Sequence, residues 1–291
     1  MPPAARITDA TMHGSPLAPG PGSLNVLIGS LNAWRTLIDQ HLCPAFSISG
    51  PDGVGSVLMG SPTVWTNNQM ACRQMDIVIE KPGAALGPAN PIAVGCPTVE
   101  IGGPVAVMLT VDGVTFVSFG GLNISGSAED VNLFLSMMAE TAAATTAARL
   151  HFATLAGDTA HPITLLLGRD QKGVLGDSFA SNEVNMADLE RFSATPPAGH
   201  PKATSRDEII THFLVERHDA AANGSNFNAA HQAGINAQND IRNERGQPTI
   251  TSQAFAHDAA GNPIGRVSYS DGSHEDLNIS PNGNISGVTP P

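Results

Sequence analysis

The stretch Val26-Leu-Ile-Gly-Ser-Leu-Asn-Ala-Trp34 is followed by two similar stretches, Val57-Leu-Met-Gly-Ser-Pro-Thr-Val-Trp65 and Ile92-Ala-Val-Gly-Cys-Pro-Thr-Val99. Each has an apolar run, a glycine able to adopt a positive φ, a turn and a second apolar run, the pattern of a tight β-hairpin. The stretches align without gaps, with their central glycines 31 and 35 residues apart. A period near 30 residues indicates an array of repeats, so the sequence predicts three β-hairpins.

An arginine with an aspartate three or four residues later also occurs three times in this region. Such a pair either neutralises charge at the end of a strand or forms a structural clip that recurs in each hairpin. In both cases, the threefold recurrence predicts pseudo-threefold symmetry. The pairs are Arg6 with Asp9, Arg35 with Asp39, and Arg73 with Asp76.

Three hairpins around one axis form a cone, whose apex has little volume for a hydrophobic core. A bound metal can replace that core. The segments after the first two aspartates carry His13, His41 and Cys43. Histidine and cysteine are typical ligands of structural zinc, so we expect a zinc site at the apex.

Several motifs in the first hundred residues together resemble one known family. They are Pro3-Ala-Ala-Arg6, Asp39-Gln-His-Leu-Cys-Pro44, Gly60-Ser-Pro-Thr-Val64, Gly87-Pro-Ala-Asn-Pro91 and Gly95-Cys-Pro-Thr-Val-Glu-Ile-Gly102. Residues 1 to about 104 resemble the PAAR-repeat proteins, which cap the trimeric valine-glycine-repeat spike of type VI secretion and related contractile injection machines. The resemblance implies a conical β fold, binding to the blunt end of that spike, and a zinc ion near the tip held by three histidines and one cysteine.

The third histidine of that ligand set has no counterpart here. We expect it in the stretch Gly50-Pro-Asp-Gly-Val-Gly55, where this chain has Asp52. The remaining ligand is therefore Asp52, a water molecule, Cys72 or Cys96, although a cysteine in or beside an apolar strand is more often a small buried core residue. The metal ligands predicted on this basis are His13, His41, Cys43 and Asp52.

Composition and charge divide the chain into two parts. Glycine and proline number 30 and 22 and aromatic residues make up only 4%, as expected for turn-rich β structure in the first part. The net charge of −12 is distributed as −2 over residues 1–104 and −10 over the rest. Since the acidic second part offers no basic patch, we expect no nucleic-acid partner.

The chain starts without the basic and apolar regions of a signal peptide, and no apolar run approaches the length of a membrane span. Three cysteines do not form a paired disulfide framework. We therefore expect no integral membrane segment and a location in the bacterial cytoplasm until an injection machine secretes the protein into target cells.

The predicted fold class is α+β, with a PAAR-like tip domain at 1–104, a hairpin connector at 105–126 and a mixed extension at 127–291. Asp112-Gly113 is a strong hairpin signal within the connector. Ser127 is the N-cap of a helix expected to continue to about Ala148. Further predictions are a strand at 163–167, a short helix at 186–192, and a C-terminal β-hairpin formed by 263–269 and 275–279 around Asp271-Gly272.

A helical hairpin contains the chemistry-bearing residues of the extension. Ser205-Arg-Asp-Glu208 is a capping-box pattern that begins a helix to about Ala222, and a second helix follows from Phe227 to about Arg245. We expect His231 opposite His218. The carboxylates and histidines on the facing helices then hold a metal or supply a general acid and base, or the polar stripe of the first helix is simply a solvated surface. The predicted catalytic residues are Glu208, His212, Glu216 and His231.

Two classes of function fit this organisation. In the first, the tip domain docks on the trimeric spike and the extension is an injected effector, a toxin whose enzyme class the sequence does not define. An effector implies an immunity protein, expected to offer positive charge to the −10 extension. In the second, the extension is a structural adaptor that docks a separate cargo protein and has no catalytic activity.

Overall fold

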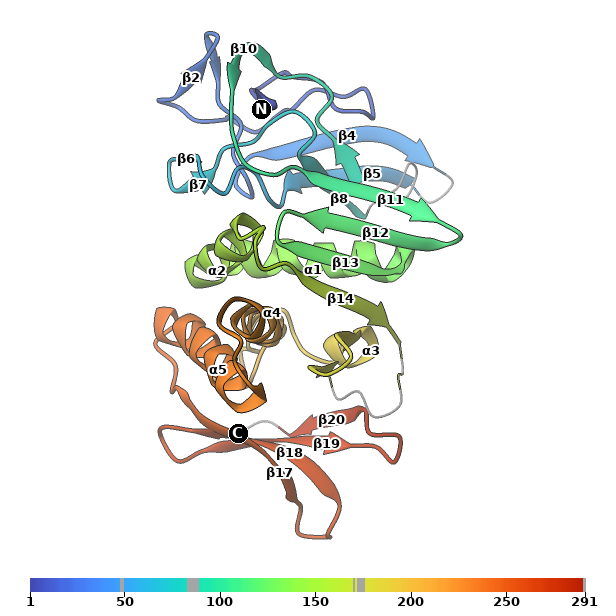
Figure 1. Cartoon of the computed structure of the whole chain (residues 1–291), viewed down its shortest axis with the longest axis vertical. Helices are drawn as coiled ribbons and strands as arrows, with labels where there is room; N and C mark the ends of the chain where they lie inside the picture. Colours follow the sequence, from blue (N-terminus) through green and yellow to red (C-terminus); the bar gives the residue numbers. More distant parts are fainter. Residues whose placement is uncertain (48–49, 83–88, 170, 172–175, 290–291) are drawn as a thin grey trace. The chain divides into compact units, whose positions relative to one another are not determined.

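The computed structural model describes residues 1–47, 50–82, 89–169, 171 and 176–289. Within these residues the fold is mixed α+β, with five helices and strands in several sheets, as the sequence predicts (Figure 1). The chain divides into two compact units. The first comprises Met1–Leu109, Phe116–Leu122 and Ala156–Thr159, and the second comprises Thr110–Thr115, Asn123–Leu155 and Ala160–Pro291.

Short strand pairs and one antiparallel sheet make up most of the first unit. The two-stranded pairs are β1 (Pro3–Ala4) with β10 (Cys96–Glu100), β2 (Leu27–Ile28) with β3 (Leu31–Asn32), and β6 (Trp65–Thr66) with β7 (Gln69–Met70). The sheet has the order β4-β5-β8-β9, with bounds Gln40–Ser47, Gly50–Val57, Ile77–Pro82 and Ala89–Pro91.

A closed ring of backbone hydrogen bonds lies at the centre of this unit. The amide of Ala5 donates to the carbonyl of Cys72, Cys72 donates to Trp34, and Trp34 donates back to Ala5, at 2.9, 3.0 and 2.9 Å. All three residues are fully buried. Because each of them directly precedes one of the three arginines, the ring gives the three repeats equivalent positions, consistent with the predicted pseudo-threefold symmetry.

A second layer of the repeat surrounds the ring. Two residues after each arginine, a non-glycine residue has a positive φ, at 67°, 64° and 73°. The amide of that residue donates to a buried apolar residue at 3.1, 3.0 and 2.9 Å. The three donor and acceptor pairs are Thr8 with Leu17, Leu37 with Val57, and Met75 with Ile92. The three acceptor residues and the three ring residues pack in one core cluster, which also contains Val78.

The glycine alignment needs one correction. Gly22, Gly60 and Gly95 are the equivalent positions, because an added Cβ at each would lie 2.5–3.1 Å from the carbonyl oxygen of Ala33, Ala71 or Ala4. The predicted first member, Gly29, is therefore shifted by seven residues. Of the three glycines predicted from the sequence, Gly29, Gly60 and Gly95, only Gly29 has the expected positive φ, at 55°. Close packing, not φ, requires glycine at the other two positions. Likewise, Trp34 is fully buried whereas its aligned partner Trp65 is 40% exposed.

A six-stranded sheet follows the repeats, with the order β11-β12-β13-β14-β16-β15. Asp112 and Gly113 both have positive φ at the turn between β11 and β12, in agreement with the predicted hairpin. The parallel pair β14 and β16 is joined through the segment that includes β15. The strand bounds are Ala106–Val111, Val114–Phe119, Leu122–Ser127, Ile163–Gly168, Asp177–Ser178 and Glu183–Asn185, from β11 to β16.

The first predicted helix is divided in two, α1 (Ala128–Ala144) and α2 (Thr146–Gly157). Ser127 is the N-cap of α1, and its hydroxyl accepts a hydrogen bond from the amide of Asp130 at 3.1 Å. The helix stops because Thr145 is extended and the carboxylate of Glu244 accepts the amides of Thr146 and Ala147, both at 2.9 Å. This tertiary cap starts a new helix where local propensity predicts a continuous one.

The helical hairpin is formed by α4 (Arg206–Asn223) and α5 (Phe227–Glu244), with the short α3 (Met186–Leu189) ahead of it. Gly224 in the left-handed conformation ends α4, and the side chain of Asn226 caps α5. The predicted capping box at Ser205 is wrong in its bonding. Ser205 occupies the N-cap position, but its hydroxyl contacts the Asp207 carboxylate at 2.5 Å and that of Glu208 at 3.0 Å, not a helix amide.

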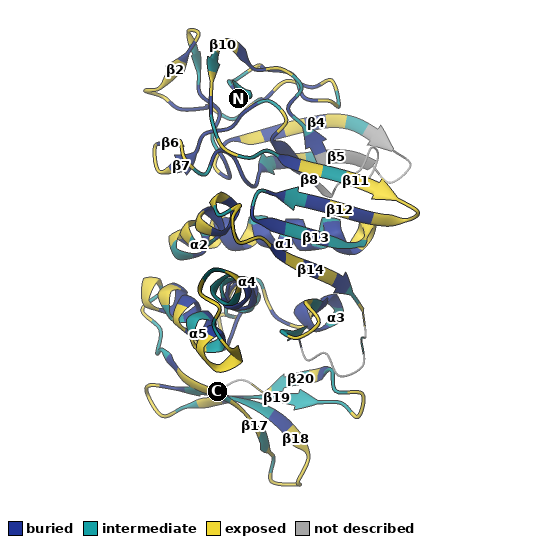
Figure 2. Ribbon diagram, viewed as in Figure 1, coloured by how far each residue is buried: buried dark blue, intermediate teal, exposed yellow. Residues whose placement is uncertain are grey.

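The C-terminal sheet is larger than the single hairpin predicted. It is a four-stranded antiparallel meander of β17 (Ile250–His257), β18 (Pro263–Tyr269), β19 (His274–Ile279) and β20 (Ile285–Thr289). The predicted hairpin corresponds to β18 and β19. Figure 2 colours the buried residues of this sheet dark blue, and they include Ile250, Val267 and Tyr269, which pack with Ile235 of α5.

None of the helices in the described part of the chain has both the length and the apolar character needed to cross a bilayer.

Candidate functional site

The three arginine and aspartate pairs form the same clamp in each repeat of the first unit. In every case, the backbone amide of the arginine donates to Oδ2 of its aspartate at 2.8 Å. The guanidinium adds two further bonds, from Nε to Oδ2 at 2.9–3.2 Å and from Nη2 to Oδ1 at 2.8–2.9 Å. Of the two alternatives for these pairs, the geometry corresponds to the repeated structural clip.

The third clamp is the most buried. Burial raises the pKa of Asp76 to about 6, although Nε and Nη2 of Arg73 both donate to the carboxylate. The other guanidinium hydrogen bonds of Arg73 go to the carbonyls of Gly102, Gly103 and Pro104 at 2.7–2.9 Å. Arg73 thereby fixes the segment that leaves the last repeat.

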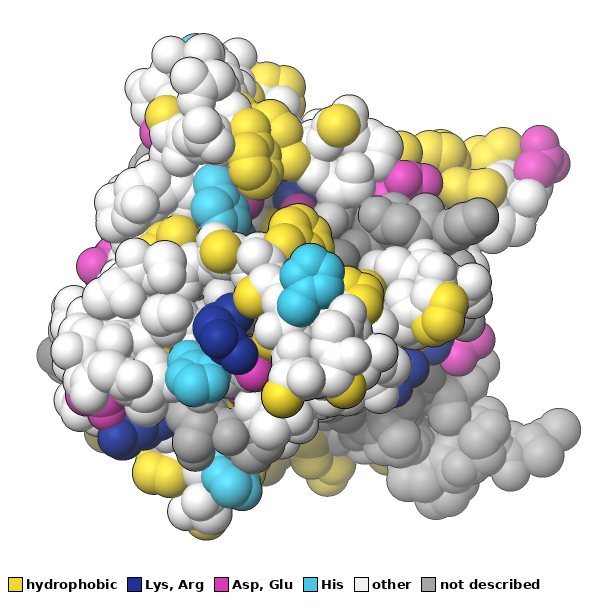
Figure 3. Space-filling model, turned by 90° about the horizontal axis from the view of Figure 1, so that it is seen from below, with side chains coloured by type: hydrophobic (Ala, Val, Ile, Leu, Met, Phe, Trp, Pro, Cys, Tyr) yellow, Lys and Arg dark blue, Asp and Glu magenta, His cyan; other side chains and the backbone are white. Residues whose placement is uncertain are grey.

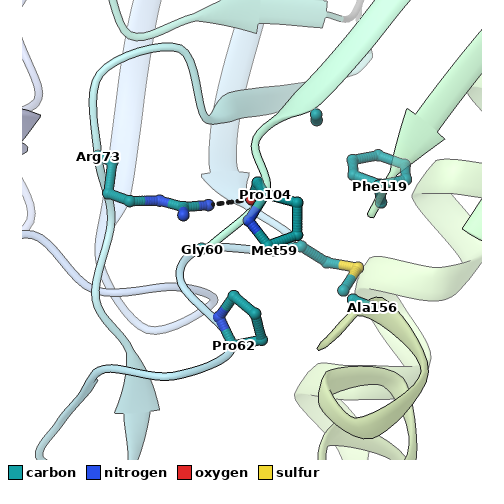
Figure 4. Close-up of a pocket in the computed structure, with 8 residues that line it drawn as sticks. Met59, Gly60, Pro62, Arg73, Pro104, Phe119 and Ala156 are labelled. Atoms are coloured by element: carbon teal, nitrogen blue, oxygen red, sulfur yellow. Dashed lines mark hydrogen bonds between the residues drawn. The ribbon is translucent and has the colours of Figure 1, made fainter. Parts of the chain in front are cut away.

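Figure 4 shows the pocket beside this arginine, lined mainly by apolar side chains, with Met59, Pro62, Pro104 and Phe119 around it. The dashed line in the figure marks the bond from Arg73 to Pro104. Since five acceptors already take the five guanidinium hydrogens, Arg73 has no donor left for a ligand. We therefore assign this pocket to packing rather than to function.

Each repeat contributes one potential metal ligand, four residues after its aspartate. These are His13 after Asp9, Cys43 after Asp39, and Glu80 after Asp76. Their donor atoms all lie within 4.8 Å of one another. The His13 Nδ1 is 3.0 Å from Glu80 Oε2 and 3.7 Å from Cys43 Sγ. The repeat thus brings three equivalent side chains together.

His41 adds a fourth donor to this group. Its Nε2 lies 3.2 Å from Glu80 Oε1 and 3.2 Å from the Ser15 hydroxyl. Its Nδ1 lies 2.8 Å from the carbonyl oxygen of Pro16, which only accepts hydrogen bonds, so Nδ1 carries a proton. In the neutral imidazole, Nε2 then presents its lone pair toward the group. We call His13, His41, Cys43 and Glu80 the N-terminal cluster.

The environment of the N-terminal cluster is buried and polar. His41, Cys43 and Glu80 are at most 1% exposed. Burial raises the pKa of the Cys43 thiol. Burial also opposes ionisation of Glu80, but in the absence of a metal hydrogen bonds from the protonated form of His41 and from Asn90 outweigh it and lower the pKa of that carboxyl group. Asn90 also fixes the loop of His13, since its Oδ1 accepts the His13 amide at 2.9 Å.

The donor set of this cluster fits the metal that the family resemblance implies. Two imidazoles, one thiol and one carboxylate are ligand types that zinc accepts, and the buried lone pair of His41 facing a carboxylate is a place for a cation. In such a site the four side chains would hold the ion. The ion would cross-link the three repeats where the apolar core is small, and it would favour the thiolate form of Cys43.

The fourth member of the N-terminal cluster, Glu80, was not predicted from the sequence. The side chain of the predicted Asp52 lies outside the described residues, as does the start of the 87–91 motif. Cys72 belongs to the central ring, and Cys96 packs in a second core cluster with its thiol 3.4 Å from Thr98. In the third repeat, Glu80 occupies the position equivalent to His13 and Cys43. The equal spacing of four residues from each aspartate is the signal that identifies it.

Three of the four predicted catalytic residues meet in the second unit, at the interface of α4 and α5. His212 Nε2 lies 2.9 Å from Glu216 Oε2 and 3.1 Å from His231 Nδ1, and the Glu216 and His231 atoms are 3.3 Å apart. His212 and Glu216 are buried, at 7% and 3% exposure, so this part of the stripe is not a solvated surface. We call these three residues the helical cluster.

Electrostatics within the helical cluster favour an ionised carboxylate. Burial opposes the charge of Glu216, but hydrogen bonds from the protonated forms of His212 and His231 outweigh burial in the absence of a metal and lower the pKa of this carboxyl group to about 2. His231 also stacks on Phe227, with ring centroids 5.2 Å apart. This stacking orients the His231 ring toward the other two residues.

Two details of the sequence prediction are wrong here. Glu208 is not part of the helical cluster, because its carboxylate accepts a bond from Arg242 at 2.9 Å, and both side chains are fully buried. Burial raises the pKa of Glu208 to about 7. The partner of His231 is His212 and not His218, which lies about 120° around α4 from His212.

Basic side chains are dispersed on the face shown in Figure 3, where lysine and arginine occur singly among the coloured residues. Several basic side chains of the second unit are paired with carboxylates. Examples are Lys202 with Asp271 and Arg245 with Asp207. These pairs neutralise charge locally.

Comparison with known proteins finds no matching family model, no matching curated protein and no matching solved structure.

Proposed function

We propose that the first unit is the metal-stabilised tip of a contractile injection machine, and that the rest of the chain is an effector delivered with it. The observation that carries the proposal is the threefold ring of Ala5, Trp34 and Cys72 with an equivalent ligand position in each repeat. A single chain that caps a trimer must present three similar surfaces to three identical subunits. A pseudo-threefold unit meets this requirement.

The surface for the spike is expected at the strand pairs. Val26 and Leu27, at the start of the β2–β3 pair, are equivalent to Val64 and Trp65, at the start of the β6–β7 pair: they follow the repeat glycines Gly22 and Gly60 by four and five residues. All four are exposed, at 36–62%. Large apolar side chains exposed in a repeated pattern are typical of a binding surface.

Replacing both Leu27 and Trp65 with aspartate is expected to weaken binding to the trimeric valine-glycine-repeat spike by about 30-fold or more, because buried tryptophan anchors typically contribute 2 kcal/mol or more. Binding of the full chain to purified spike trimer, followed by interferometry, measures this. The matched control is Phe255→Asp, since Phe255 is 79% exposed but lies in β17. Equal binding by the double variant and the wild type would contradict this surface.

The helical cluster supports an effector role for the second unit, because two histidines and a carboxylate that meet at a helix interface are not required for packing two helices. We expect the full chain to arrest growth of a laboratory bacterium, either when made in the cytosol or when exported to the periplasm. His231→Ala is expected to relieve the arrest at equal protein level, whereas His257→Ala, at an exposed position of β17, is not.

The outcome separates the two classes of function. Arrest that His231→Ala abolishes would support an enzymatic effector and identify the compartment of its target. No arrest in either compartment would contradict an antibacterial effector. The second unit would then be better explained as an adaptor, whose cargo should co-purify with it.

A further inference from the structure

We propose that the helical cluster is a second metal site, in which His212, Glu216 and His231 bind a divalent zinc-type ion with one coordination position open to solvent. The carrying observation is the convergence of three donor atoms at 2.9, 3.1 and 3.3 Å from one another. In a tetrahedral zinc site with bonds of about 2.1 Å, ligand atoms lie about 3.4 Å apart. The triangle needs to open by only a few tenths of an ångström.

Hydrogen bonding around His212 leaves a lone pair on its Nε2 that points into this triangle. The Nδ1 of His212 lies 2.7 Å from Gln238 Oε1, and that oxygen also accepts a bond from Gln253 Nε2 at 3.0 Å. An amide oxygen only accepts, so Nδ1 carries the proton and Nε2 of the neutral ring is an acceptor. Nε2 therefore faces another acceptor, the Glu216 carboxylate at 2.9 Å, and it also faces His231 Nδ1, which presents a lone pair when the His231 ring is protonated at Nε2.

A single cation accounts for the 2.9 Å approach of two acceptors, His212 Nε2 and Glu216, and it takes His231 Nδ1 as its third ligand. A proton on Nε2 would be shared between two partners and would require a charged imidazolium ring in a buried position, whereas a metal ion binds all three lone pairs. The bond from His212 to Gln238 is also the arrangement that orients metal-bound histidines in proteins, in which the other ring nitrogen donates to a carbonyl or carboxylate.

The backbone of α5 is shaped around this histidine. A Cβ added at Gly234 would lie 2.9 Å from three ring atoms of His212, including Nε2. Glycine at this position lets the ring lie against the helix. On α4, His212 and Glu216 are four residues apart and share one face. The two helices therefore supply a site of the type found between facing helices of bundles.

The exposure of the three ligands indicates an open coordination position. The side chains of His212 and Glu216 are 9% and 4% exposed, but that of His231 is 27% exposed. The ion would be reached by solvent on the His231 side and would bind water there. Two histidines and one glutamate with an open position are a ligand set of hydrolytic zinc enzymes, in which the metal lowers the pKa of the bound water to about 7.

The test uses the full chain and two readouts. Zinc content by elemental analysis is expected to be two equivalents per wild-type chain, one in each cluster. Cobalt substitution separates them, because only the N-terminal cluster contains a thiolate and gives a thiolate-to-cobalt charge-transfer band. His231→Ala and Gly234→Ala are expected to lose one equivalent and the visible nitrogen and oxygen spectrum, and to keep the charge-transfer band. Gln238→Ala should weaken zinc binding at the helical cluster by about 10–100-fold.

Controls make each result decisive. His257→Ala should retain both equivalents, and helical circular dichroism of each variant shows whether α4 and α5 remain folded. Unchanged metal content in folded His231→Ala and Gly234→Ala would overturn this proposal and leave a protonated histidine pair as the explanation. One equivalent that His231→Ala removes, without a charge-transfer band in the wild type, would instead contradict zinc at the N-terminal cluster and sustain this second site.

Discussion

Replacing Cys43 with alanine is expected to abolish tight zinc binding by the first unit and to lower its melting temperature by more than about 15 °C. The physical reason is the size of the metal contribution. Structural zinc contributes about 10–16 kcal/mol of apparent binding free energy in small domains, so losing one ligand removes several kcal/mol. In a unit of about 100 residues, each kcal/mol corresponds to about 4–8 °C. Elemental analysis and calorimetry of the full chain measure both effects.

Cys96→Ala is the matched control, since this thiol is also buried but contacts Thr98 rather than the N-terminal cluster. A second comparison identifies the fourth ligand. Glu80→Gln keeps the size of the side chain but removes its charge, and it should weaken zinc binding, whereas Asp52→Asn should not. Stoichiometric zinc in a folded Cys43→Ala variant would contradict the ligand set. Loss of zinc only in Asp52→Asn would return the fourth position to the residue predicted from the sequence.

The sequence predicts the repeat well from its charged arginine and aspartate pairs, and poorly from glycines that are required by close packing. Arginine and aspartate pairs have few local uses, so their threefold recurrence identifies the true repeat unit. Glycine has several uses. Gly29 adopts a positive φ in a turn, whereas Gly60 has no positive φ and lies against the carbonyl of Ala71, and a pattern search does not distinguish these reasons. The first hairpin alignment is therefore shifted, and the predicted third hairpin is wrong because β10 pairs with β1, although the number of repeats is right.

Glu80 illustrates the same limit at the candidate metal site. A glutamate in an apolar strand carries no zinc signature by itself, and the expected ligand types directed the prediction to histidine, cysteine or Asp52. Only the distance from the preceding aspartate relates Glu80 to His13 and Cys43. Once the three clamps are superposed, the position four residues later becomes the common ligand position.

In the helical hairpin, periodicity predicts the stripe but not the partners. Steps of four residues advance an ideal helix by about 40° beyond a full turn, so Glu208 lies about 80° from Glu216. This rotation is sufficient to direct Glu208 to Arg242 and Glu216 to the histidines. Partners on α5 depend on side-chain packing between the helices, which the sequence of one helix does not contain.

Replacing Glu208 with alanine is therefore expected to destabilise the second unit by about 3–5 kcal/mol, and any loss of activity would follow from unfolding rather than from chemistry. Arg242 is fully buried, donates to Glu208 at 2.9 Å and lies 4.4 Å over the ring of Tyr269. Without the carboxylate its charge would be left in the interior, where the acceptors remaining to it among the described residues are the carbonyls of Pro248 and Lys202. Denaturant unfolding of the full chain, followed by helical circular dichroism, measures the loss.

Glu140→Ala is the matched control, because Glu140 also pairs with an arginine, Arg206 at 2.8 Å, but its side chain is 41% exposed. An exposed pair of this kind contributes about 1 kcal/mol or less. Glu208→Gln should lie between the two variants, since the amide oxygen still accepts from Arg242. If Glu208→Ala were as stable as Glu140→Ala and lost activity, Glu208 would act in the chemistry after all. The contrast between a stability loss for Glu208→Ala and a metal loss for His231→Ala thus separates the buried ion pair from the helical cluster on the same two helices.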